Sequence, residues 1–162
     1  MFVPFEKMTS NARVWVYQAN EELNAAQVII IEQESQKFIE QWTAHKQTLK
    51  GSCKVFYNRF VVIAVDESFN QVSGCSIDAS VHFLQALETA LQIKLFDRTQ
   101  QAFWTTDKKL NTLSIKNIKQ QIAEGTIQAD TLVFNNLVDN MAELQSNWQK
   151  EAKNSWLGRY FD

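Results

Sequence analysis

The chain has 162 residues, enough to bury a substantial core in one domain or in two small ones. Its formal net charge of -2 gives no general attraction to nucleic acid or anionic lipid, and no apolar run approaches the roughly 20 residues of a membrane span. Because the N-terminus lacks a secretory signal segment and two cysteines are too few for a disulfide scaffold, we expect a cytoplasmic protein that binds neither nucleic acid nor membranes.

The chain opens with a predicted strand and a long predicted helix. Arg13–Gln18 is rich in β-branched and aromatic residues and predicts the strand. Asn20 offers a side-chain oxygen as helix N-cap, and apolar residues at helical spacing predict a helix from there to about Trp42. The run Val28–Ile31 would also suit a buried strand, but its polar flanks favour the helix.

The next segments predict a hairpin, a second helix and a further strand. Cys53–Tyr57 and Phe60–Val65 flank the short connection Asn58-Arg59 and predict an antiparallel hairpin. Apolar residues recur at helical spacing from Ile77 to Leu91, and Ala102–Thr105 is strand-like. The resulting order, β-α-β-β-α-β, is that of a ferredoxin-like sheet with two helices on one face.

The remainder of the chain, from Leu110 onward, predicts shorter elements. Leu110–Leu113 predicts a short strand, and Ser114 is placed to cap a helix that ends at Gly125. Thr131–Phe134 is strand-like, and Ala142–Lys150 predicts a final helix.

Ser114–Phe134 resembles the helix, glycine and strand portion of the GYF-like domains of bacterial proteins. This resemblance implies a small domain that binds peptides or partner proteins, although the aromatic dock of true GYF domains has no counterpart at matching positions. The fold class is therefore predicted as α+β. We expect a ferredoxin-like domain at residues 1–98 and a small GYF-like domain at residues 99–162 packed on it.

The whole chain also resembles an uncharacterised bacterial family whose members often carry the label "ABC transporter ATPase". Six segments carry this resemblance: Arg13–Gln18, Trp42–His45, Tyr57–Phe60, Val65–Glu67, Ser73–Asp78 and Val133–Asn136. The family implies no established function. A P-loop needs two glycines five residues apart followed by Lys and Ser or Thr, and the four glycines of this chain lie too far apart. The sequence therefore excludes a P-loop ATPase.

The segment Val72–His82 places a thiol, hydroxyls, a carboxylate and an imidazole where a strand feeds a helix. If Ser76 is the N-cap, Cys75 lies just outside the helix, where free backbone N–H groups stabilise a thiolate and create a nucleophile. Alternatively, Gly74 makes the turn, Asp78 complements the helix dipole in the first turn, and Cys75 is a small buried hydrophobe. The second interpretation is favoured.

A nucleophilic Cys75 would need a base. Cys75 and His82 lie on nearly the same helix face but roughly 10 Å apart along its axis, so they should not hydrogen-bond. His45 is the better candidate, provided that the fold brings it to the turn. Asp78 precedes His82 by four residues and can orient its imidazole, although a solvated polar stripe is the commoner meaning. In this hypothesis Ser76 and nearby backbone N–H groups hold the charged intermediate, and His45 or His82 handles protons, with Asp78 beside His82.

No metal or cofactor is expected. Four residues have the chemistry of zinc ligands, but no two of them form a close Cys-x-x-Cys or His-x-x-x-His pair: His45, Cys53, Cys75 and His82. Asp66 and Glu67 follow the predicted hairpin and are ligand-binding candidates together with Ser76. Exposed loop carboxylates are the ordinary explanation for such a pair.

Aromatic residues crowd the C-terminal segment: Trp148, Trp156, Tyr160 and Phe161. They either pack back on the core or form a surface for self-association. We favour packing and expect a monomer or a weak homo-oligomer.

Two hypotheses for function remain. The preferred one is a non-catalytic binding or adaptor protein that recognises a protein or a small-molecule ligand in the groove between the two halves. The alternative is a thiol-dependent enzyme that uses Cys75 as its nucleophile.

Overall fold

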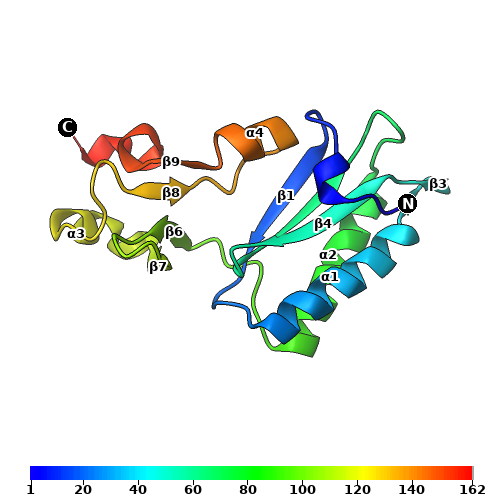
Figure 1. The fold of residues 1–162 in the computed structure, drawn as a ribbon, viewed down its shortest axis with the longest axis horizontal. Coiled ribbons are helices and arrows are strands. Elements are labelled where there is room, and N and C mark those ends of the chain that lie inside the picture. Colours follow the sequence, from blue (N-terminus) through cyan, green and yellow to red (C-terminus); the bar gives the residue numbers. More distant parts are fainter. Residues whose placement is uncertain (162) are drawn as a thin grey trace.

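The structure is a computed structural model that describes residues 1–161, and its α+β architecture contains two separate larger sheets (Figure 1). The first sheet has the order β1-β5-β4 and is antiparallel throughout; its strands are β1 (Arg13–Gln18), β4 (Gly51–Phe56) and β5 (Phe60–Val65). The second has the order β7-β6-β8-β9; its strands are β6 (Gln100–Trp104), β7 (Leu110–Ser114), β8 (Leu132–Phe134) and β9 (Gln149–Glu151). A small hairpin is made of β2 (Thr43–Ala44) and β3 (Gln47–Thr48).

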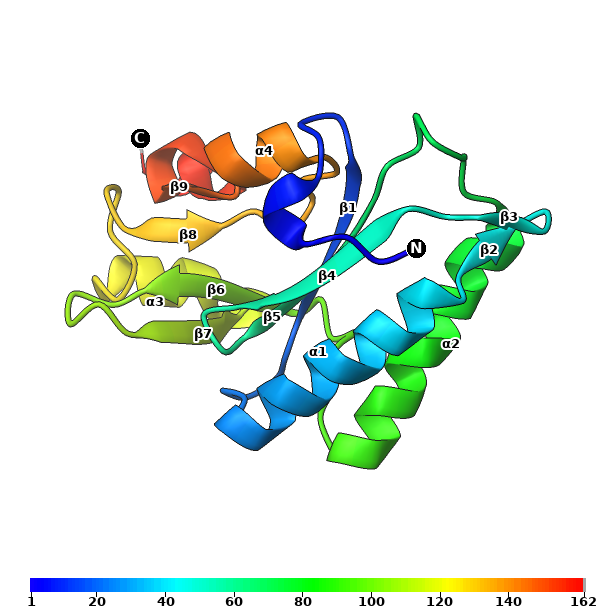
Figure 2. The same cartoon turned by 45° about the vertical axis from the view of Figure 1, so that its right-hand side comes forward.

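Two long helices, α1 (Ala25–Glu40) and α2 (Gly74–Leu91), cover one face of the first sheet (Figure 2). α1 buries Ile31, Ser35 and Ile39, which are spaced four residues apart and therefore share one helix face. Their apolar contacts with the sheet form the first core cluster. No helix within residues 1–161 is long and apolar enough to cross a membrane.

The opposite face of the first sheet packs against the C-terminal half. Side chains from β1 and β5 form a second core cluster with residues of β6, β8 and α4 (Met141–Ser146). Trp148 lies at its centre, with ring centroids 5.0 Å from Phe60, 5.2 Å from Phe134 and 5.4 Å from Phe56. β5 is thus covered on both faces, which explains why it is apolar at all six positions.

The C-terminal segment packs internally. Leu157 and Ala152 are buried in a third core cluster, beneath the second sheet and α3 (Ile118–Ala123). Tyr160 and Phe161 pack against the same cluster. Trp156 is 45% exposed, and its Nε1 donates a hydrogen bond to Gln101 Oε1 at 2.8 Å.

Several predicted elements are found as expected. β1 has the predicted bounds, and Val28–Ile31 is helical. β4 and β5 form the predicted hairpin, but β4 begins at Gly51 and ends at Phe56, so Tyr57 lies in the turn rather than in the strand. Asn58, with φ 51, and Tyr57, with φ 54, make the turn, and Arg59 donates its N–H to the Phe56 carbonyl.

The predicted cap of α1 is wrong. α1 begins at Ala25, and its N-cap is Asn24, which exchanges hydrogen bonds with Gln27 in a capping box. The Asn20 side chain instead accepts a hydrogen bond from the N–H of Lys94, beyond α2. The helix ends at Glu40, short of Trp42.

Other differences concern the C-terminal half. The strand after α2, now β6, pairs with β7 and β8, so the first sheet has three strands rather than a ferredoxin-like four. Ser114 makes no side-chain cap, because a 3₁₀ helix at Ile115–Asn117 precedes α3. The predicted helix Ala142–Lys150 is shorter: α4 ends at Ser146, and the chain then forms β9.

Candidate functional site

The turn before α2 is built differently from the prediction. Its N-cap is Ser73, not Ser76: Ser73 Oγ accepts the Ser76 N–H at 3.1 Å, and Ser76 Oγ accepts the Ser73 N–H at 2.7 Å. Cys75 therefore lies inside the first turn, and it is exposed rather than buried. Asp78 is the fifth helical residue, and the first turn contains no acidic residue.

Ser76 is fully occupied by structural contacts. Its hydroxyl also donates to the Ser73 carbonyl at 2.8 Å, and its own carbonyl accepts the indole N–H of Trp42 at 2.8 Å. With its side chain buried, Ser76 offers no group that points to a ligand or to a charged intermediate.

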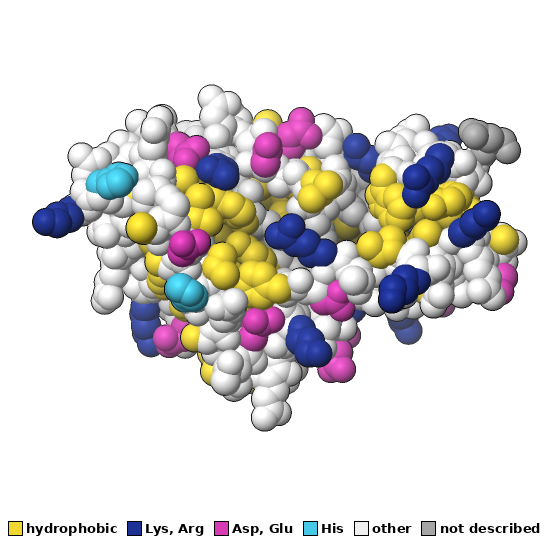
Figure 3. Space-filling view, turned by 180° about the vertical axis from the view of Figure 1, so that it is seen from behind, with side chains coloured by type: hydrophobic (Ala, Val, Ile, Leu, Met, Phe, Trp, Pro, Cys, Tyr) yellow, Lys and Arg dark blue, Asp and Glu magenta, His cyan; other side chains and the backbone are white. Residues whose placement is uncertain are grey.

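The four residues proposed for catalysis are not joined by hydrogen bonds or ion pairs. His45, Cys75, Asp78 and His82 are all exposed, and among residues 1–161 no hydrogen bond or ion pair joins any two of them. His45 has φ 49 and occupies the turn of the β2–β3 hairpin. Histidine side chains, cyan in Figure 3, do not gather at one place on that face of the molecule. Within residues 1–161 the structure therefore shows no base that is hydrogen-bonded to the thiol.

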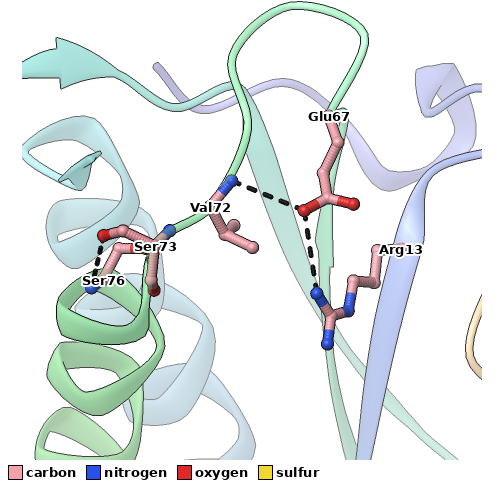
Figure 4. A network of polar contacts seen from close by, with 5 residues as sticks. All are labelled: Arg13, Glu67, Val72, Ser73 and Ser76. Carbon is pink, nitrogen blue, oxygen red and sulfur yellow. Dashed lines mark hydrogen bonds and ion pairs between the residues drawn. The ribbon is translucent and has the colours of Figure 1, made fainter. Parts of the chain in front are cut away.

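Asp66 and Glu67 organise the loop between β5 and α2. Asp66 is buried, and hydrogen bonds from Ser68, helped by the nearby Lys50 ammonium, hold the pKa of its carboxyl below the usual value. Glu67 accepts the Val72 N–H at 3.4 Å and lies 3.7 Å from the Arg13 guanidinium (Figure 4). Both carboxylates thus hold the loop in place and are already partnered.

Cys53 is unsuited to metal ligation or nucleophilic chemistry. Burial raises the pKa of its thiol to about 12, so it stays protonated at neutral pH. In the described part of the chain no three His, Cys, Asp or Glu side chains gather closely enough to hold a metal ion.

The buried Cys53 thiol predicts a loss of stability in alkali. The unfolded thiol ionises near pH 9, whereas the folded thiol keeps its proton until about pH 12, so stability falls as pH rises between these values. Between pH 9 and 10 we expect the free energy of unfolding to fall by about 1 kcal/mol more in the wild type than in Cys53→Ala. Urea unfolding at both pH values measures this difference. Burial also raises the pKa of Tyr17, which lowers stability in alkali in both proteins and therefore does not affect their difference. Equal losses of unfolding free energy in the two proteins would contradict the prediction.

A groove of about 400 Å³ lies between β1 and the C-terminal half. It is lined by β1, by the segment 95–101 that leads from α2 into β6, and by the segment 134–139 that leads from the end of β8 into the next loop. Ile115 and Trp156 also line it. This volume falls within the usual range for ligand sites. The groove follows the side of β1 that faces away from β5.

The backbone of β1 leaves its middle open toward this groove. In an antiparallel pair of strands, only every second residue forms backbone hydrogen bonds with a given neighbour. Ala19 donates its N–H to the Arg59 carbonyl, so residues 13, 15 and 17 are the ones whose backbone groups face β5. Residues 14, 16 and 18 face the other way, and there the Val14 N–H donates to the Asp139 carbonyl at 2.9 Å. Within residues 1–161 the N–H groups of Val16 and Gln18 have no hydrogen-bond acceptor.

The groove combines a chain of hydrogen-bonded polar side chains with exposed apolar side chains along its border. The Gln18 side chain donates to the Gln100 carbonyl at 3.2 Å and accepts from Asn136 at 2.9 Å, and Asn136 in turn accepts the indole N–H of Trp148 at 2.9 Å. Three exposed apolar side chains border the groove: Leu137 (84%), Trp156 (45%) and Ile115 (38%). Exposed apolar side chains that gather around a concave site are typical of binding surfaces.

A second hollow of about 590 Å³ lies at the outer end of the second sheet. Threonine side chains dominate its lining, together with Trp104, Lys108 and Asp130. It has no open strand edge comparable to that of β1, because β6 is paired on both sides. The groove beside β1 is therefore the stronger candidate.

Comparisons with protein-family models, with curated proteins and with solved structures find no match to this chain. Sequence reasoning anticipated a groove between the halves but placed none of its candidate site residues there. The available signal was the apolar pair Leu137-Val138, which lies between polar residues in the short loop Asn135–Asp139 directly after a strand.

Proposed function

We propose that this protein is a non-catalytic binding or adaptor protein that recognises a protein segment or a small molecule in the groove beside β1. The observation that carries the proposal is the open middle of β1, where the N–H groups of Val16 and Gln18 face a groove with an apolar rim. Such a site combines a few directed polar groups with apolar walls, as ligand sites generally do.

The fold supports the same proposal. We infer that the N-terminal half is a three-stranded relative of the ferredoxin-like arrangement and that the C-terminal half is a GYF-like module packed against it. The extensive core between the halves, with Trp148 at its centre, supports a groove whose walls are held rigidly. The resemblance to the uncharacterised bacterial family is compatible with this proposal and adds no activity to it.

The thiol-dependent alternative lacks comparable support. Cys75 is exposed on α2, and within the described residues neither imidazole forms a hydrogen bond. Ser76, the proposed partner for a charged intermediate, is committed to the helix cap.

The test is a ligand screen read by amide NMR. A library of small-molecule fragments and a pool of short synthetic peptides are added to the ¹⁵N-labelled protein. We expect shifts to cluster at Val16, Gln18, Asn136 and Leu137, and to be unchanged in Cys75→Ser. Shifts clustered around Cys75, or no saturable binding by any compound, would contradict the proposal.

A further inference from the structure

We infer that the groove receives an extended peptide, which adds to β1 as an extra strand and places a carboxylate beside Arg98. This inference rests on the proposed function, because it names the ligand class for the same groove. Its basis is the pattern of paired and unpaired groups along β1.

The free edge of β1 is occupied at both ends and open between them. At one end Asp139 accepts the Val14 N–H, and Met141 donates to the Ala12 carbonyl. At the other end the Asn20 N–H donates to the Lys94 carbonyl at 3.0 Å. From Val14 to Gln18 a strand spans roughly 14 Å, which suits a peptide segment of three or four residues. Main-chain groups of an extended peptide are the natural partners for this row of donors and acceptors.

The occupied ends of the β1 edge also argue against a second copy of the chain as the occupant of the groove. Pairing two β1 edges would need a continuous free edge on each molecule. Here the segments at Lys94 and at 139–141 cover both ends of the edge, so an intact second molecule cannot lay its own β1 alongside. A flexible segment that fits the short open window meets no such obstacle.

The charges in the groove indicate which peptide fits. Arg13 is already paired with Glu67, whereas Arg98 makes no ion pair within residues 1–161. The carboxylate of Asp97 is held by Thr99 at 2.9 Å, and that of Asp139 accepts from Asn140 at 3.0 Å. Among the described groove residues, Arg98 is therefore the basic side chain without an ion-pair partner, and a peptide carboxylate can pair with it through charge-assisted hydrogen bonds. The exposed Leu137 and Trp156 favour apolar side chains elsewhere in the peptide.

The test uses heptapeptides selected from a random phage-displayed library against the intact protein. The strongest binder is synthesised in N-methylated versions, one for each of its central amides. Because only alternate amides of an added strand face β1, we expect methylation to weaken binding more than 10-fold at alternate positions only. Bound peptide should also slow hydrogen exchange at the Val16 and Gln18 amides more than 10-fold.

Arg98→Ala should lower the affinity for the peptide by up to about 5-fold, as expected for an exposed ion pair. This loss of affinity should be smaller at high salt. Lys119→Ala is the matched control, because Lys119 is exposed, makes no ion pair within residues 1–161 and lies outside the groove lining, so the affinity of this variant for the peptide should not change. A peptide selected without any acidic group, bound equally well by Arg98→Ala, would overturn the carboxylate part of the inference.

The outcomes separate this inference from the proposed function. Shifts at Leu137 and Asn136 without protection of Val16 and Gln18 would overturn strand addition and leave the groove as the binding site. If no peptide can be selected although small-molecule fragments bind the groove, the inference that the ligand is a peptide would likewise be overturned. Concentration-dependent dimerisation that protects the same two amides would assign the edge to a second copy. Peptides that bind only elsewhere would overturn both proposals.

Discussion

Iodoacetamide is expected to label Cys75 at least about 100-fold faster than Cys53 in the folded protein at pH 8. Alkylation requires both access and a thiolate. Cys75 is exposed, whereas Cys53 is buried and its pKa is raised to about 12 by that burial. The rates are measured separately in the Cys53→Ala and Cys75→Ser variants, and both thiols should react at similar rates in denaturant.

The absolute rate at Cys75 decides between the two hypotheses for function. We expect a rate similar to that of a cysteine in an unstructured peptide, because within residues 1–161 no base or cation forms a hydrogen bond or ion pair with the thiol. A rate far above this standard, with a dependence on His45 or His82 in alanine variants, would support the enzyme and contradict the adaptor.

Trp148→Ala is expected to lower the free energy of unfolding by about 3–5 kcal/mol. The indole is buried among Phe56, Phe60 and Phe134, and its N–H is satisfied by Asn136. Truncation therefore leaves a large cavity where the halves meet and an amide without its partner. Urea unfolding, followed by far-UV circular dichroism, measures the loss.

Trp156→Ala is the matched control for this substitution. Trp156 is partly exposed and makes one hydrogen bond, to Gln101, so the expected loss is about 1–2 kcal/mol. If Trp148→Ala does not fold, Trp148→Phe should fold with an intermediate stability, because it keeps part of the ring packing. If the two alanine variants lost the same free energy of unfolding, Trp148 would not be the main packing residue between the two halves.

Sequence patterns predicted those elements whose local signal agrees with their final environment. Phe60–Val65 is apolar throughout, and its strand is indeed covered on both faces. The β4–β5 hairpin follows from Asn58, which tolerates the positive φ that the turn requires. For such segments local preference and tertiary packing favour the same structure.

The errors arose where the chain offers several equivalent choices. Asn20 and Asn24 are both good helix caps, as are Ser73 and Ser76, and the structure uses the other member of each pair. Asn20 is engaged by Lys94, a contact between residues far apart in the chain. Likewise, the composition of β6 indicates a strand but not its partner, and its partners lie in the second sheet.

The candidate site was the part least accessible from sequence. The turn at Cys75 contains residues of chemically reactive types, but catalysis also requires that such residues meet in space. The groove depends instead on which backbone groups of β1 remain unpaired, and this is fixed by the positions of Asp139 and Lys94. Neither residue carries a sequence signal for that role.

The central claim is that ligands bind the groove beside β1 rather than the turn before α2. It is tested most directly by titrating the strongest ligand from the screen into the wild type and three variants, with affinity measured by calorimetry. Leu137→Asp alters the groove rim and should not unfold the protein, since Leu137 is 84% exposed. Ile29→Asp, on the exposed side of α1, and Cys75→Ser are the controls. We predict at least 10-fold weaker binding by Leu137→Asp and unchanged binding by both controls, whereas unchanged binding by Leu137→Asp together with a loss in Cys75→Ser would contradict the claim.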